Sequence, residues 1–372
     1  MRAPAYLDHN ATSPLRPEAL DAMVEALRAG GNPSAVHSAG RRARGLVETA
    51  RRRVAALVGC LPGEVVFTSG GTEANNMALR GCGRRRVLVS AVEHDSVLKA
   101  CPGTEVIPVD REGMLDLAAL ERALSRSGDP TLISVMLANN ETGVIQPVGE
   151  VVRLARRSGA AVHCDAVQAA GKVPFDVHGL GVDYLSLSAH KLGGPTGVGG
   201  LVVCRESPLM SDRRGGSQEA NRRAGTENVA GITGFGAAAE AARSGLSVGP
   251  WRDRLEATLL GFAPGARVFG GGAARLSNTS CISMPGVKAD TQVMALDLAG
   301  LCVSAGAACS SGKVQRSAVL DAMGVEPAEA ATAIRVSLGW NSEEGDIDRL
   351  IAAWRDLYIR VGKSDIDNAR AA

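Results

Sequence analysis

Short apolar runs alternate with helical patterns through the first two thirds of the chain. Six runs, each followed by small or polar residues, are typical of buried strands: 63–71, 85–94, 131–140, 160–168, 182–191 and 197–206. Between some of them, apolar residues recur at helical spacing, in 72–81, 115–127 and 148–159. This alternation predicts an α/β fold built from βαβ units around a mostly parallel central sheet.

The pattern changes near residues 245–265, where glycine and proline interrupt the helical spacing. The rest of the chain mixes short strand-like runs with helical stretches, which is typical of an α+β unit. We therefore expect two domains. The larger would span residues 15–250 and the smaller would combine residues 1–14 with residues 251–372.

Polar residues stand at the carboxyl ends of the expected strands. They are Thr68 and Ser69, Glu93 and His94, Asn139 and Asn140, Asp165, and Ser188, His190 and Lys191. In open parallel sheets, ligands bind beyond the carboxyl ends of the strands. The sequence therefore predicts a functional site at this edge of the sheet.

Lys191 is unusual among the six lysines because it stands between an alternating strand and a glycine-dense turn. Partial burial would disfavour its ammonium form and make the amine a better nucleophile toward an aldehyde. Asp165 strengthens this interpretation, because a pyridine cofactor needs an amine to form an imine and a carboxylate to keep its ring nitrogen protonated. On local grounds, a lysine at a strand end is usually a solvated turn residue, and Asp165 fits equally well the N-cap of the segment that follows.

The segment "TSGGTEANN" (68–76) joins a strand to the start of a helix. Backbone N–H groups there, with the hydroxyl of Thr72, would bind a phosphate. A capping box of Thr72 with Asn75, or a plain tight turn, would explain the same residues without a ligand. Gly234, Gly236 and Ala239 match the dinucleotide pattern G-x-G-x-x-A, but no convincing strand precedes them, and we interpret them as helix packing by small residues.

Cys309 differs from the other seven cysteines because glycine, alanine and serine surround it, with Lys313 four residues later. A thiolate could form in such an exposed loop, although an incidental loop cysteine fits as well. Arg335 lies in a strand-like stretch that would bury its stem. A buried arginine needs a carboxylate, and an amino-acid substrate would supply one.

Composition narrows the class of protein further. The formal net charge is +2 and acids are interleaved with bases, so we expect no nucleic-acid partner. No apolar run reaches about 18 residues and the N-terminus has no apolar signal region, so we expect no membrane association and a cytoplasmic location. The eight cysteines include no C-x-x-C pair, which argues against a disulfide framework and a structural zinc site.

Taken together, the sequence segments described above resemble those of the cysteine desulfurases of the NifS and IscS type, within the class V aminotransferase group. The resemblance runs from "YLDHNATSP" through "GNPSAVH", "FTSGGTEANN", "HCDAVQ" and "SLSAHKLGGPTGVG" to "SAGAACSSG" and "AIRVSLG". It implies a homodimeric enzyme of fold type I with the cofactor pyridoxal 5'-phosphate (PLP). Such an enzyme would convert L-cysteine to L-alanine, leave a persulfide on Cys309, and pass the sulfur to an acceptor or scaffold protein for iron–sulfur cluster assembly.

The resemblance also implies roles for individual residues. Lys191 would be the Schiff-base lysine, Asp165 would pair with the pyridine nitrogen, and His94 would stack on the ring. The other expected contacts are with the ring oxygen or the substrate side of the cofactor (Asn140, Gln168), with the phosphate (Gly71, Thr72, Ser188, His190, and Thr226 of the other subunit) and with the substrate carboxylate (Arg335, Asn140, and Asn32 nearby). No resident metal is expected, and ligation of a [2Fe–2S] cluster by Cys309 in a scaffold complex stays open.

Three alternatives stay open at this point. A selenocysteine lyase would differ only in the chalcogen. Another class V aminotransferase or β-lyase, acting on a different amino acid, would leave Cys309 a bystander. A non-catalytic PLP-binding scaffold would bind the cofactor without turnover, but the sequence argues against it because all the expected catalytic residue types are present.

Overall fold

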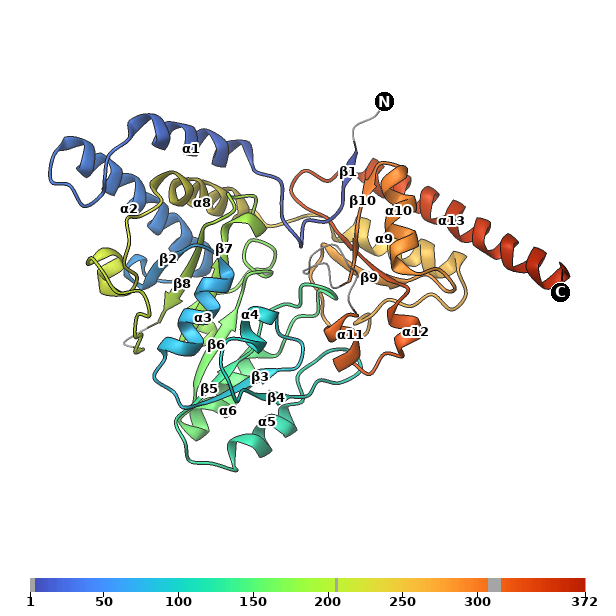
Figure 1. Cartoon of the computed structure of the whole chain (residues 1–372), viewed down its shortest axis with the longest axis horizontal. Coiled ribbons are helices and arrows are strands. Elements are labelled where there is room, and N and C mark those ends of the chain that lie inside the picture. The colour runs from blue at the N-terminus through green and yellow to red at the C-terminus, as the bar shows by residue number, and fades with distance from the viewer. Residues whose placement is uncertain (1–3, 205–206, 307–315, 372) are drawn as a thin grey trace.

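The computed structural model describes residues 4–204, 207–306 and 316–371, with side chains up to residue 361 (Figure 1). Its centre is a seven-stranded sheet, which in spatial order consists of β2 (Val65–Thr68), β8 (Gly199–Val203), β7 (Tyr184–Ser188), β6 (Ala161–Asp165), β5 (Thr131–Ser134), β3 (Arg86–Ser90) and β4 (Glu105–Ile107). β8 runs in the direction opposite to the other six strands of this sheet. The predicted α/β fold and all six predicted strands are confirmed.

Helices cover both faces of this sheet (Figure 1). One face packs against α1 (Pro17–Ala29), α2 (Ser38–Val58), α5 (Leu117–Leu124), α6 (Val148–Ser158), α7 (Val177–Leu180) and α8 (Val229–Ala242), and the other against α3 (Gly71–Gly81) and α4 (Asp95–Leu98). Successive side chains of a strand point to opposite faces of the sheet. Val65 and Phe67 of β2 therefore face the first core, while Val66 faces the second. Within the first layer, a Cβ on Gly236 would lie 2.5 Å from Ala50 Cα, so α8 packs on α2 through small residues as predicted.

The C-terminal part contains a smaller antiparallel sheet with the order β11 (Ser304–Ala305), β12 (Ala333–Ser337) and β9 (Thr279–Ser283). The N-terminal strand β1 (Ala5–Tyr6) pairs with β10 (Leu301–Cys302). The surrounding helices are α9 (Gly249–Phe262), α10 (Ala289–Leu298), α11 (Ala318–Ala322), α12 (Pro327–Ala330) and α13 (Glu344–Ala371), the last of which projects from the body in Figure 1. Leu7 and Trp354 belong to one buried cluster here. The predicted division into two domains stays a prediction.

The strand directions define where a site can form. Apart from β8, all strands of the large sheet run in one direction, so their carboxyl ends meet at one edge. The chain after β1 passes along this edge, where the Ser13 N–H donates to the His190 carbonyl at 2.8 Å. Asp8 forms a bridge with Ser337 of β12, so the same segment contacts both sheets.

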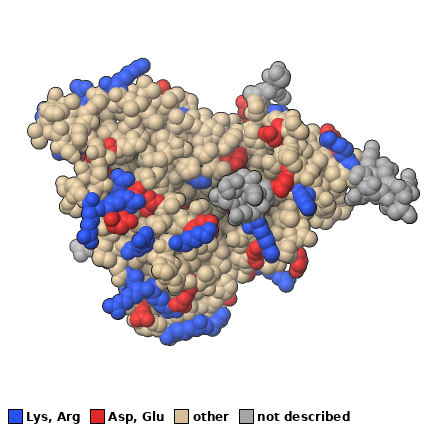
Figure 2. Space-filling model, in the orientation of Figure 1, with Lys and Arg blue, Asp and Glu red and all other residues tan. Residues whose placement is uncertain are grey.

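The surface carries both signs of charge. On the face shown in Figure 2, basic and acidic side chains lie in mixed groups. Among the helices of the described residues, none is both long and apolar enough to span a lipid bilayer.

Candidate active site

A cavity of about 320 Å³ lies at the carboxyl edge of the large sheet, as predicted. This volume is typical of small-molecule sites. Ten of the predicted site residues line it: Gly71, Thr72, His94, Asn140, Asp165, Gln168, Ser188, His190, Lys191 and Arg335. The structure thus brings together side chains that come from five strand ends and from the smaller sheet.

Two predicted site residues lie away from this cavity, and a third falls outside the described residues. Asn32 lies in an exposed loop, where its Oδ1 accepts a hydrogen bond from the Ser34 N–H at 2.9 Å. Thr226 is exposed and lines a separate cavity. Cys309 lies outside the described residues. Their expected roles stay predictions.

Asp165 ends β6 and is held by two donors. Its Oδ1 accepts from the Val167 N–H at 2.9 Å, and its Oδ2 accepts from Asn75 Nδ2 at 2.8 Å. Residues 166–171 form turns and no helix, so Asp165 is not the N-cap that local sequence allowed. Both bonds leave the carboxylate fixed at the wall of the cavity.

Asn75 is a site residue that the sequence analysis considered only as part of a capping box. It lies on α3 and its Nδ2 also donates to Ser96 Oγ at 2.9 Å. The N-cap of this helix is Gly70, which has no side chain that could accept a capping hydrogen bond. The capping box of Thr72 with Asn75 is therefore wrong. The signal was the position of Asn75 three residues after Thr72, about one helical turn along, which places both residues on the face of α3 that lines the cavity.

His94 precedes α4 and caps it. Its Nδ1 accepts from the Ser96 N–H at 3.0 Å and lies 2.8 Å from Ser96 Oγ. A ring nitrogen that accepts a backbone hydrogen bond cannot carry a proton, so the imidazole is neutral with its proton on Nε2. The bonds to Ser96 fix the orientation of the ring at the cavity wall.

Lys191 closes a 3-10 turn, Ala189–Lys191, directly after β7. Its Nζ donates to the carbonyl oxygens of Asn10 at 2.5 Å and Ala11 at 2.8 Å. Neighbouring His190 lies 3.1 Å from Thr12 Oγ1 through its Nδ1, and burial together with the charge of Lys191 lowers the pKa of His190 to about 4. His190 is therefore neutral at pH 7. Lys191 lines the cavity and is only partly exposed, and its role there stays a prediction.

The start of α3 forms one end of the cavity. A Cβ on Gly71 would lie 2.9 Å from Val167 Cγ2 and 3.5 Å from Ser188 Cβ, so only glycine fits at this close approach. The first N–H groups of a helix have no partner within the helix and favour an anion. The hydroxyls of Thr72 and Ser188 line the same cavity, so this end fits a phosphate group.

Arg335 enters the cavity from β12 and is 3 % exposed. One terminal nitrogen donates to the Asn140 carbonyl at 3.1 Å and the other to Asp8 Oδ1 at 2.7 Å. From the sequence, a substrate was expected to supply the carboxylate, whereas Asp8 already supplies one. Arg335 Nε is buried and has no hydrogen-bond partner among the described residues, so a donor remains for a ligand.

An amine, a fixed carboxylate, an anion-binding helix start and a buried guanidinium thus share one cavity. This set of groups fits PLP together with an amino-acid substrate. Within the described residues, no cluster of histidine, cysteine, aspartate and glutamate side chains could hold a metal ion. The class of protein that these groups define is a PLP-dependent enzyme acting on an amino acid.

The chain belongs to the aminotransferase class-V family, whose sequence model matches residues 5–350. A cysteine desulfurase of Cereibacter sphaeroides is 46 % identical over 363 residues, which cover 93 % of each chain. An IscS-like cysteine desulfurase of Mycobacterium tuberculosis is 38 % identical over 99 % of this chain and 100 % of its own. A NifS-like protein from Rickettsia africae ESF-5, with 34 % identity, matches in structure with a TM-score of 0.88 over 95 % of this chain and 99 % of its own. The family resemblance and the fold of type I PLP enzymes are confirmed.

Proposed function

We propose that this chain is a PLP-dependent cysteine desulfurase and that its reaction takes place in the cavity at the edge of the large sheet. One observation carries the assignment of the site: Lys191, Asp165 and Arg335 line the same cavity although they come from three separate elements. The supporting context is the family membership and the relatives named cysteine desulfurase.

Asp165 and Lys191 would hold the cofactor from two directions. Bound PLP supplies an electron sink for the electrons of a broken bond at the substrate Cα. Asp165 keeps a proton on the pyridine nitrogen, because its charge favours the protonated form and its own position is fixed by Val167 and Asn75. Lys191 would hold the cofactor through its aldehyde carbon.

The same amine then moves protons. Lys191 Nζ would remove the Cα proton of L-cysteine and later return protons to the product. The neutral ring of His94 forms a flat wall that excludes water from one side of the cofactor. His190 stays uncharged at neutral pH because its pKa is lowered to about 4, so it would contact the phosphate end as a neutral group.

Arg335 would bind the substrate carboxylate. Its stem is buried, and its guanidinium is oriented by Asp8 and by the Asn140 carbonyl. A planar guanidinium recognises a carboxylate by both charge and geometry. This contact would place the substrate Cα beside Lys191.

Cys309 would take the sulfur. Its thiolate attacks the sulfur of the bound cysteine, so that a new S–S bond forms while the Cβ–S bond breaks and leaves its electron pair on Cβ. Protonation there gives L-alanine, and the enzyme carries a persulfide. The sum is L-cysteine plus a protein thiol giving L-alanine plus a protein persulfide, which needs no external oxidant.

The same proposal includes the oligomeric state, the location and the sulfur acceptor of the enzyme. The enzyme would act as a cytoplasmic homodimer in which Thr226 of each subunit serves the phosphate of the other. A thiol of an acceptor or scaffold protein would remove the persulfide sulfur for iron–sulfur cluster assembly. The exposed position of Thr226, away from the cavity of its own chain, supports this arrangement.

The test is the product ratio from L-cysteine in the presence of a thiol reductant. Alanine and sulfide should form in equal amounts, and Cys309→Ala should lose both while it still binds PLP. Cys302→Ala, which changes a half-buried cysteine of β10, is the matched control and should keep the activity. Pyruvate and ammonia as products, or activity untouched by Cys309→Ala, would contradict the desulfurase and favour a β-lyase.

A further inference from the structure

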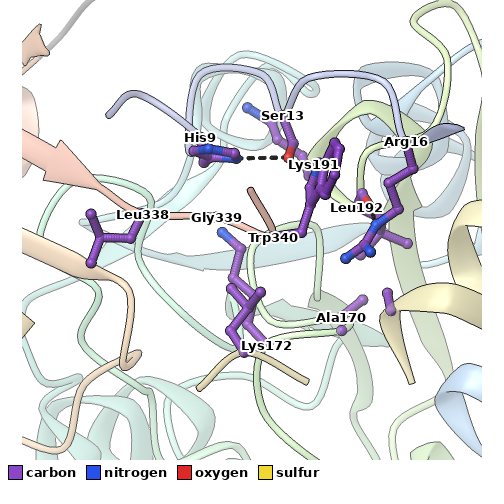
Figure 3. Close-up of a pocket in the computed structure, with 13 residues that line it drawn as sticks. His9, Ser13, Arg16, Ala170, Lys172, Lys191, Leu192, Leu338, Gly339 and Trp340 are labelled. Atoms are coloured by element: carbon purple, nitrogen blue, oxygen red, sulfur yellow. Dashed lines mark hydrogen bonds between the residues drawn. The ribbon is translucent and has the colours of Figure 1, made fainter. Parts of the chain in front are cut away.

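Lys172 is a buried amine that the proposed reaction does not use. It is 9 % exposed and follows β6 and its turn. Its Nζ donates to Asn10 Oδ1 at 2.8 Å and to Gln168 Oε1 at 2.7 Å. Figure 3 shows Lys172 and Lys191 beside one small cavity of about 20 Å³. Burial, followed by the charges of Lys191 and Arg335, lowers the pKa of Lys172 well below its usual range.

Lys172 and the Asn10 carbonyl together define the orientation of the Gln168 amide. An ammonium group has donors and no acceptor, so the atom of Gln168 that it contacts must be the oxygen. The amide nitrogen then lies on the other side, where it donates to the Asn10 carbonyl at 2.9 Å. A flipped amide would place two acceptor oxygens against each other at Asn10, whatever the protonation of Lys172.

This orientation has a consequence for the large cavity, which Gln168 also lines. An amide nitrogen carries two N–H groups, and the Asn10 carbonyl uses one of them. The second is a donor, so a ligand atom beside it must be an acceptor. The Asn10 carbonyl also accepts from Lys191 Nζ at 2.5 Å, so the amide and the reactive amine share one anchor.

We propose that Lys172 is a positioning residue that holds the Gln168 amide with its N–H toward the ring oxygen of PLP. The inference rests on the proposed function, because it assumes that Gln168 faces that oxygen. A donor at this place stabilises negative charge on the ring oxygen. It therefore lowers the pH at which the link between Lys191 and the cofactor loses its proton.

The experiment measures the absorbance of the PLP-loaded enzyme against pH, without substrate, for the wild type and three variants. They are Lys172→Met, Gln168→Met and the double variant. Each single variant should raise the midpoint by roughly one pH unit, the shift expected for one hydrogen bond to a charged group. The double variant should show the midpoint of Gln168→Met alone, since Lys172 acts through the amide.

Two results would overturn the proposal. An unchanged midpoint in Lys172→Met would show that the lysine does not orient the amide. Shifts that add up in the double variant would show that Lys172 acts on the cofactor through its charge.

A second variant decides the matter if Lys172→Met does not fold. Gln168→Glu keeps an oxygen for Lys172 but removes the N–H, so it should raise the midpoint at least as far as Gln168→Met and weaken PLP binding roughly tenfold. An unchanged midpoint would contradict the proposed orientation. Failure of the proposed function has a different signature. If Lys191 does not bind PLP, the wild type shows no pH-dependent absorbance that is lost in Lys191→Ala.

Discussion

The two walls of the large cavity are built in different ways. The sheet wall consists of residues at or just beyond the carboxyl ends of strands, such as Asp165, the last residue of β6, and Lys191, in the turn after β7. The opposite wall joins the N-terminal segment to the smaller sheet, where Asp8 contacts Arg335 across 327 positions of the chain. The sheet wall supplies the groups that would react, and the N-terminal wall orients them.

Asn10 shows how the second wall works. Its side-chain nitrogen donates to Thr279 Oγ1 at 2.9 Å and to the Asn140 carbonyl at 3.1 Å, while its own carbonyl accepts from Lys191 and Gln168. One short segment thus ties both sheets to the reactive amine. The comparison predicts that changes in the sheet wall abolish chemistry, whereas changes in the N-terminal wall weaken binding.

The largest effect is expected for Lys191→Ala. The variant lacks both the covalent anchor and the base at Cα, so turnover should fall by roughly 10⁴-fold. Alanine formation from L-cysteine measures it. Lys99→Ala is the matched control, because Lys99 is an exposed lysine paired with Asp95, and this variant should keep the activity of the wild type. Substantial turnover by Lys191→Ala would remove Lys191 from the reaction.

Asp165→Asn should have the next largest effect. Asparagine keeps the size of the side chain but not the charge that holds a proton on the pyridine nitrogen, so kcat should fall by roughly 10²-fold. Asp183→Asn is the control, since Asp183 precedes β7 at the other edge of the sheet and accepts from the Val162 N–H at 2.8 Å. Equal losses of kcat in both variants would mean that the carboxylate at β6 has only a structural role.

Asp8→Ala tests the N-terminal wall. Without its ion pair the guanidinium of Arg335 loses a fixed orientation, and KM for L-cysteine should rise by roughly tenfold with a smaller change in kcat. Asp253→Ala, which removes an exposed carboxylate paired with Arg252, should leave KM unchanged. A fall in kcat with an unaltered KM would contradict the division of labour between the two walls.

The smallest effect is expected on stability, from a buried histidine of the sheet wall that lies two residues before Asp165. His163 lies between Ser134 Oγ at 2.8 Å and Ser186 Oγ at 2.9 Å, and burial lowers its pKa to about 3. An unfolded histidine titrates near 6.5, so between about pH 6.5 and 3 the unfolded chain binds a proton that the folded chain excludes. Stability supplied by neutral His163 is therefore present above that window and is lost as the pH falls through it.

His163→Gln isolates this contribution, because glutamine offers polar partners to both serines and does not titrate. The wild type should lose about 1.4 kcal/mol of unfolding free energy per pH unit relative to the variant below about pH 6.5. Urea unfolding at pH 7, 6 and 5 measures the difference. Parallel curves for the two proteins would show that His163 is charged in the folded state.

The same comparison explains what the sequence could predict. The fold and the sheet wall were predictable because a strand and the polar residue after it are neighbours in the chain, as in "HCDAVQ" and "SLSAHK". Asp8, Asn10 and Lys172 were not assigned to the site, because their partners are set by tertiary contacts that no local pattern encodes. β4 was missed since Glu105 and Val106 are exposed and leave no apolar run.

The most direct test of the account is to locate the covalent anchor of the cofactor. The PLP-loaded protein would be reduced with borohydride, digested and analysed by mass spectrometry, which fixes the pyridoxyl group to one lysine. The account predicts that the group is on Lys191 and that Lys172, the neighbouring buried amine, is unmodified. A pyridoxyl group on Lys172, or none on Lys191, would contradict it.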